Sequence, residues 1–74
     1  MNKDLLKFLR VNKGMTQKEL GELIGVSHAT INSYEKGRKP IPTNRVRQFY
    51  KIFGEEYIEH AKLFLEGGSL NGRV

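Results

Sequence analysis

Residues 16–37 read TQKELGELIGVSHATINSYEKG, and this stretch predicts two short helices joined by a tight turn. Thr16, followed by Glu19, forms a capping box, in which each side chain satisfies a backbone N–H of the other residue. Gly25 favours the left-handed conformation that ends a helix, and Ser27 offers a second N-cap just after it. So short a turn makes the second helix leave at a steep angle, which is the geometry of a helix-turn-helix motif.

The apolar residues of this stretch recur at helical spacing, so each helix has one face that can be buried. The apolar positions are Leu20, Leu23 and Ile24 in the first helix and Val26, Ile31 and Tyr34 in the turn and second helix. A side chain at Gly21 would press against the second helix. The positions left pointing outward are His28, Ala29, Asn32, Ser33 and Lys36.

The motif resembles the helix-turn-helix of the Cro/C1 repressor family, also called the XRE type. The positions that match the family pattern are Thr16-Gln17, Glu19-Leu20, Ile24-Gly25-Val26-Ser27, Ile31, Glu35, Gly37 and Pro42. The resemblance extends from about Leu5 to Phe53 and implies an all-α, five-helix, lambda-repressor-like DNA-binding domain. Gly21 departs from the alanine usual in the family, at a cost of about 1 kcal/mol in helix propensity.

Helical patterns also flank the motif. A first helix is expected before it, ended by Gly14. Its apolar stripe comprises Leu5, Leu6, Leu9 and Val11. The prolines of residues 36–42 predict a loop after the motif, because a residue that precedes proline is restricted to extended conformations. A fourth helix follows, capped by Thr43 or Asn44 and ended by Gly54. Its large core residues are Val46, Phe49, Tyr50 and Phe53.

A fifth helix is expected from Glu55 to about Glu66, because acidic residues suit the positive end of the helix dipole. Its apolar side comprises Tyr57, Ile58, Ala61, Phe64 and Leu65. Gly67-Gly68-Ser69 should break this helix. The expected organisation is therefore a DNA-binding domain in residues 1–66 and a flexible tail in residues 67–74.

Composition limits the function classes. The 74 residues contain no cysteine, no glycine-rich phosphate loop and no paired carboxylate or Ser/His/Asp set, so neither an enzyme nor a small-molecule substrate is expected. His28 and His60 lack the spacing of metal ligands, so we expect no metal and no cofactor. Without a long apolar run or signal-peptide pattern, the expected location is cytoplasmic, nucleoid-associated on DNA, with no membrane partner.

Charge is unevenly distributed along the chain. The net charge is +5, but residues 1–54 carry eleven Lys and Arg against four Asp and Glu, whereas residues 55–74 carry two against four. The segment that resembles a DNA reader is thus the basic one, as binding to the phosphates of double-stranded DNA requires.

A recognition helix enters the major groove N-terminus first, so its first two turns meet base edges. By resemblance, His28, Ala29 and Ser33 match the family positions that contact bases, with Thr30 and Asn32 beside them. The expected base-contacting set is Ser27, His28, Ala29, Thr30, Asn32 and Ser33. His28 suits guanine, Asn32 or Ser33 suits adenine or a phosphate, and Ala29 suits a thymine methyl. The alternative for His28 is a solvated polar residue.

Phosphate contacts form a second set. By resemblance, the side chain of Gln17 and the N-terminal amide of its helix bind a phosphate, which the helix dipole favours. The remaining expected phosphate contacts are Lys36, Arg38 and Lys39 in the loop and Thr43 and Asn44 at the fourth helix. The alternative for the basic loop is an ordinary solvated loop. The resemblance also implies a partly buried ion pair between Arg10 and Glu35 that orients the reader.

The expected function is a sequence-specific transcription regulator, of the phage- or mobile-element-type repressor or Cro-like kind. The alternative is a protein-interaction module, such as an antitoxin or antirepressor. One reader makes too few base contacts to select a site in a genome, so we expect a homodimer on an inverted-repeat operator. The expected dimer interface is Tyr57, Ile58, Ala61, Phe64 and Leu65. The alternative is that this face only completes the core of the monomer.

Overall fold

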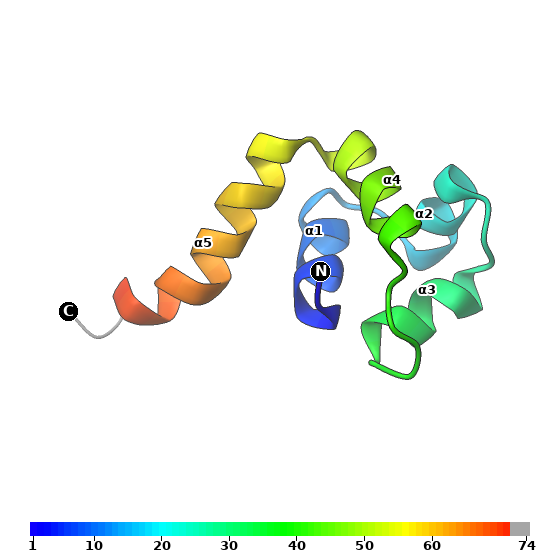
Figure 1. Cartoon of the computed structure of the whole chain (residues 1–74), viewed down its shortest axis with the longest axis horizontal. Helices are drawn as coiled ribbons and strands as arrows, with labels where there is room; N and C mark the ends of the chain where they lie inside the picture. Colours follow the sequence, from blue (N-terminus) through cyan, green and yellow to red (C-terminus); the bar gives the residue numbers. More distant parts are fainter. Residues whose placement is uncertain (72–74) are drawn as a thin grey trace.

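The structure of the chain is a computed structural model that describes residues 1–71, of which residues 67–71 are described by their backbone alone. Within residues 1–71 the chain forms five helices and no strand (Figure 1). The helices are α1 (Lys3–Asn12), α2 (Gln17–Ile24), α3 (His28–Glu35), α4 (Thr43–Phe53) and α5 (Glu55–Asn71). The predicted all-α fold, with α2 and α3 as the helix-turn-helix, is confirmed.

Local sequence signals set the ends of α2 and α3. Thr16 Oγ1 accepts the backbone N–H of Glu19 (3.0 Å), and Glu19 Oε1 accepts the backbone N–H of Thr16 (2.8 Å), which completes the capping box. Gly25 ends α2 in the left-handed region, with φ of +78°. Ser27 then caps α3 by accepting the backbone N–H of Thr30.

The predicted start of α4 was wrong by one residue. The N-cap is Pro42, which forms no side-chain cap hydrogen bond, and Thr43 and Asn44 lie inside the first turn. The carbonyl of Pro42 accepts the backbone N–H groups of both Arg45 and Val46 at 3.0 Å. Pro42 can start the helix in this way because an N-cap residue has an extended conformation and needs no N–H of its own.

The predicted end of α5 was also wrong, because the helix continues through residues 67–69 to Asn71. Glycine in a helix costs about 1 kcal/mol relative to alanine, but it does not remove the backbone hydrogen bonds that propagate the helix. Residues 67–71 of the expected tail are therefore helical. Residues 72–74 lie outside the described residues.

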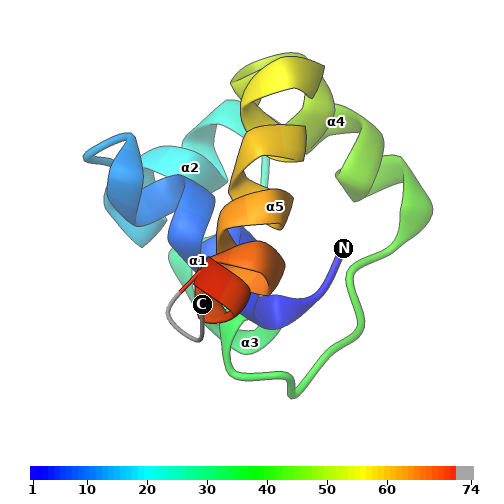
Figure 2. The same ribbon diagram turned by 90° about the vertical axis from the view of Figure 1, so that its left-hand side faces the viewer.

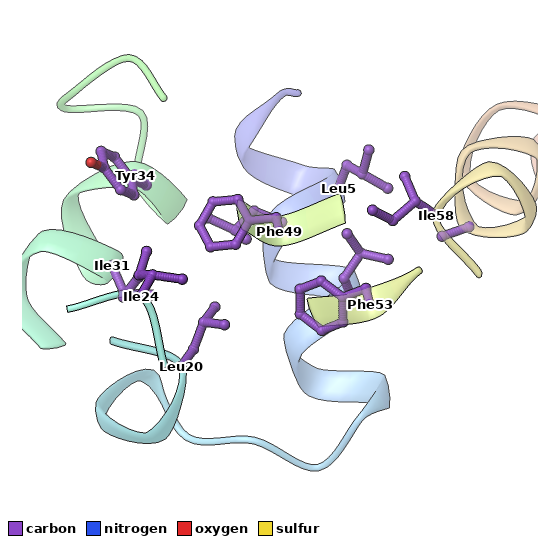
Figure 3. Close-up of a cluster of buried hydrophobic side chains, with 11 residues drawn as sticks. Leu5, Leu20, Ile24, Ile31, Tyr34, Phe49, Phe53 and Ile58 are labelled. Atoms are coloured by element: carbon purple, nitrogen blue, oxygen red, sulfur yellow. The ribbon is translucent and has the colours of Figure 1, made fainter. Parts of the chain in front are cut away.

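All five helices contribute to one apolar core (Figure 3). The buried residues are Leu5, Leu6, Leu9, Leu20, Ile24, Ile31, Tyr34, Phe49, Phe53, Ile58 and Ala61. Val46 and Tyr50 are only half-buried. Val11 and Leu23 are 54% and 57% exposed, so their inclusion in the predicted apolar stripes was wrong. Each helix buries a narrow stripe, and these two residues lie at its side.

The arrangement of the helices separates the motif from the C-terminal part of α5. The molecule measures 41 × 24 × 23 Å, with α2 and α3 at one end of the long axis and the end of α5 at the other (Figure 1). Figure 2 shows α5 running in front of α1, against which it packs through a stacked pair of rings, Phe8 and Phe64, with centroids 5.3 Å apart. No helix within residues 1–71 has the length and apolar character needed to cross a membrane.

Candidate nucleic-acid interface

The turn between α2 and α3 closes tightly over Gly21. A Cβ atom at this position would lie 2.5 Å from the carbonyl oxygen of Val26 and 3.3 Å from the carbonyl carbon of Ser27. Both are backbone atoms, which cannot move aside as a flexible side chain can. The restriction on Gly21 is therefore real, but it comes from the turn and not from α3 itself.

The inner face of α3 fixes the helix to the core. Ile31 and Tyr34 are 0% and 5% exposed, and Val26 is partly buried beside them. The outer face carries the expected base-contacting residues. His28 and Ala29 are exposed, whereas Thr30, Asn32 and Ser33 are half-buried. Ser27 is exposed, but its hydroxyl caps the helix and lies 3.2 Å from the Thr30 hydroxyl, so both hydroxyls already have a partner.

Arg10 and Glu35 join α1 to the end of α3. Arg10 Nε lies 2.6 Å from Glu35 Oε2, Nη2 lies 2.9 Å from Oε1, and Nη1 donates to the Met15 carbonyl at 2.8 Å. The two side chains are only 12% and 3% exposed. Hydrogen bonding to Glu35 holds the pKa of Arg10 above its usual value, although burial opposes the shift. The structure thus contains the ion pair that the resemblance implied.

Gln17 is part of the same network. Its Nε2 donates to Glu35 Oε1 (3.1 Å) and to Asn32 Oδ1 (3.2 Å). A side-chain amide has two N–H protons, so both are used and none is left for a phosphate. The expected contact between the Gln17 side chain and a phosphate does not fit this arrangement. The N–H groups in the first turn of α2 remain suited to it, since a helix leaves them without an intrahelical partner.

The link from Gln17 to Asn32 was not found from the sequence, although one signal was present. Asn32 precedes Glu35 by three residues, so both side chains lie on the same face of α3. Gln17 opens α2, which packs against that helix. The missing information was the crossing geometry of the two helices, which sequence spacing alone does not provide.

The basic residues lie next to α3. Lys36, Arg38 and Lys39 are exposed, and no carboxylate forms an ion pair with them among the residues whose side chains are described. The backbone N–H groups of Arg38 and Lys39 donate to the carbonyl of Ser33 at 2.9 and 3.3 Å, which folds the loop back onto the end of α3. Thr43 is exposed at the start of α4, as is Asn44. This face is rich in donors and positive charge.

The expected dimer residues of α5 fall into two groups. Ile58 and Ala61 are 0% and 4% exposed in the core of the monomer, so they are not available to a partner and that part of the prediction was wrong. Tyr57 is half-buried, with the Lys13 ammonium 4.5 Å above its ring. The residues that remain on the surface are Leu63, Phe64 and Leu65, of which Leu63 was not in the predicted set.

Among residues 1–71, no group of three or more His, Cys, Asp or Glu residues is placed to hold a metal ion. His60 lines a surface hollow between α1 and α5, together with Phe8 and Tyr57.

A five-helix fold with a closed turn and an anchored, outward-facing α3 defines the class of helix-turn-helix DNA-binding domains. The chain belongs to the helix-turn-helix family, of the Cro/C1 or XRE type, since the profile of that family matches residues 6–56. Members of this family are transcriptional regulators.

Two relatives of the chain carry names of the same family. A putative HTH-type transcriptional regulatory protein of Thermococcus kodakarensis is 34% identical over 59 residues, which are 80% of this chain but 19% of that protein. An uncharacterized HTH-type transcriptional regulator of Methanothermobacter thermautotrophicus is 34% identical over 65 residues, which are 88% of this chain and 94% of that protein. The chain thus spans about a fifth of the first relative and nearly all of the second. No solved structure matches the chain.

Proposed function

We propose that the chain is a sequence-specific, double-stranded DNA-binding transcription regulator that inserts α3 into the major groove. The observation that carries the proposal is the contrast between the two sides of α3. Ile31 and Tyr34 anchor its inner side, and the Arg10–Glu35 pair fixes its end. Its outer side leaves polar and small side chains exposed or half-exposed. A rigid helix with an accessible polar face suits the reading of base edges.

Groups suited to phosphate contacts support this role. The exposed cations of residues 36–39, which form no ion pair with any side chain that the structure describes, follow directly after α3. The helix N-termini of α2 and α4 supply backbone donors. Each phosphate that is neutralised steepens the log–log dependence of affinity on salt by about 0.9. These groups contribute affinity for any DNA sequence, while α3 contributes selectivity. The proposed location is the cytoplasm, at the nucleoid when the protein is bound.

The proposed working unit is a homodimer on an inverted repeat, as in a phage- or mobile-element-type repressor or a Cro-like switch protein. Two copies of α3 then lie about 34 Å apart, one turn of B-DNA, and enter successive major grooves on one face. The proposed interface is the surface of α5 at Phe64 and Leu65, with Tyr57 at its edge. Phe64 and Leu65 are 63% and 37% exposed, and an exposed aromatic ring is a common anchor of protein interfaces.

A second candidate function rests on the same surface of α5. Leu63 and Phe64 are both more than 60% exposed, and exposed large apolar side chains also suit a protein partner. The chain would then act as an antitoxin- or antirepressor-like interaction module. The two functions differ in what α3 does, because an interaction module does not need to select a DNA sequence.

The experiment is a selection of bound duplexes from a randomised DNA library, followed by affinity measurements over a salt series. The proposal predicts one enriched, inverted-repeat sequence that is bound more tightly than random DNA by a factor of about 10³ or more. It also predicts that affinity for both falls as salt rises. Equal affinity for all sequences would contradict sequence-specific regulation and favour the interaction module.

A further inference from the structure

A chain of hydrogen bonds leads from the buried ion pair to the proposed DNA-reading face. Arg10 donates to both oxygens of Glu35. Oε1 of Glu35 also accepts from Gln17 Nε2 at 3.1 Å, and the same nitrogen donates to Asn32 Oδ1 at 3.2 Å. Four side chains are therefore linked in series, and the last of them, Asn32, lies on the expected base-reading side of α3.

The direction of each bond in this chain is fixed by the first pair. A carboxylate held by two Arg10 donors only accepts hydrogen bonds, so Gln17 has to turn its NH₂ group toward Glu35. That group has two protons, and the second one points to Asn32. Only an acceptor can satisfy it, so Asn32 has to turn Oδ1 inward toward Gln17. The orientation of the Asn32 amide thus follows from the charge of Glu35.

The other atom of the Asn32 amide remains accessible. Asn32 Nδ2 has no hydrogen-bond partner among the described residues. Asn32 is half-buried, and no buried side-chain nitrogen or oxygen in the described part of the chain lacks a partner. Nδ2 must therefore be open to solvent. The accessible side of the Asn32 amide thus carries N–H donors, whereas Oδ1 is turned toward Gln17.

Resting on the proposed DNA-binding function, we propose that Asn32 presents only N–H donors to DNA and so binds a hydrogen-bond acceptor, with Gln17 as the residue that positions it. The acceptor is guanine N7 or O6, another acceptor of a base edge, or a phosphate oxygen. A freely turning asparagine reads adenine with both amide atoms, since it donates to N7 and accepts from N6. That pairing is disfavoured here because Oδ1 and Nδ2 cannot both point along one base edge.

The test compares the wild-type chain with Asn32→Asp and Gln17→Met by selection from the randomised library. Asn32→Asp keeps the size of the side chain and the acceptor for Gln17 but removes both donors. At one position of each half-site, the wild type should select guanine or thymine, whose polar atoms in the major groove are all acceptors. Asn32→Asp should instead select cytosine, whose N4 group donates. Gln17→Met frees the Asn32 amide to turn. The preference for the wild-type base over adenine at that position should therefore fall about tenfold.

The outcomes separate the two sources of acceptor. If the acceptor belongs to a base, Asn32→Asp changes the selected sequence. If it is a phosphate oxygen, Asn32→Asp weakens binding to every sequence alike, and the selected sequence stays the same. A changed sequence supports a donor-only Asn32, and uniform weakening supports it when Asn32→Leu, which removes the donors without adding a negative charge, weakens binding as well. Two results would overturn the proposal. One is that the wild type selects adenine at the Asn32 position and loses this preference when base analogues lack either N6 or N7. The other is an Asn32→Asp variant that binds like the wild type.

Two controls keep the test decisive. Thermal melts of each variant establish that it is folded, and NMR of the free protein checks the link itself, because Gln17→Met should shift the side-chain amide resonances of Asn32. Unchanged resonances would refute the positioning by Gln17 without reference to DNA. A wild-type chain that selects no sequence would instead refute the proposed function, so the two failures are distinguishable.

Discussion

Arg10 and Glu35 form a buried ion pair. The effect of its removal on the free energy of unfolding should depend on whether one partner or both are replaced. A single change leaves a buried charge without its partner, which costs about 3–5 kcal/mol, whereas replacement of both by apolar groups can be close to neutral. We therefore predict that Arg10→Met and Glu35→Leu each lower the free energy of unfolding by several kcal/mol and that the double variant is more stable than either. Urea unfolding measures this.

Small, equal and additive losses in that double-mutant cycle would mean that the pair behaves as an exposed one. The low exposure of the two side chains, 12% and 3%, argues for the first outcome. Because Gln17 also donates to Glu35, the Glu35→Leu variant removes a second hydrogen bond as well. Arg10→Met is therefore the cleaner of the two single variants.

The turn between α2 and α3 depends on the absence of a side chain at Gly21. Alanine would raise the helix propensity of α2 by about 1 kcal/mol, but its Cβ would meet the Val26 carbonyl oxygen at 2.5 Å. Because the backbone of the turn has to shift, we predict a net destabilisation of about 1–3 kcal/mol. Thermal unfolding of Gly21→Ala measures it, with Glu22→Ala, at an exposed neighbouring position, as the control. A more stable Gly21→Ala variant would contradict the close approach.

At the level of the helices, the sequence predicted what local signals determine. The capping box at Thr16, the left-handed Gly25 and the cap at Ser27 depend on residues close in sequence, and all three lie where expected. The end of α5 was missed because two glycines lower helix propensity without preventing a helix. The exposure of Leu23 was missed because its spacing fits the apolar stripe as well as that of Leu20 and Ile24 does. Only the packed structure shows that Leu23 lies on the solvent side of α2.

The candidate site was predictable to the same extent. Its position on α3 and the Arg10–Glu35 pair followed from the motif and its resemblance. The hydrogen bonds of Gln17 did not, because they depend on how α2 crosses α3. Likewise, the division of α5 into buried Ile58 and exposed Phe64 depends on the packing of α5 against α1.

For the whole molecule, the exposed surface of α5 should join two chains on DNA. Phe64→Glu replaces a ring that is 63% exposed and stacked on Phe8 with a negatively charged carboxylate. We predict that it weakens cooperative binding to the full inverted repeat and leaves binding to a half-site nearly unchanged. Leu23→Glu is the matched control, since Leu23 is 57% exposed on α2. Sedimentation of the complex counts chains per operator, and cooperative binding by Phe64→Glu would place the interface elsewhere.

The ratio of affinities for the selected operator and for random DNA tests most directly whether α3 reads DNA sequence. His28→Ala and Ser33→Ala remove proposed base contacts, so each should lower operator affinity by about 1–3 kcal/mol with little effect on random DNA. Arg38→Ala, a proposed phosphate contact, should weaken both and lower the salt slope by about one. An unchanged affinity ratio in both His28→Ala and Ser33→Ala would contradict the assignment of α3 as the reader.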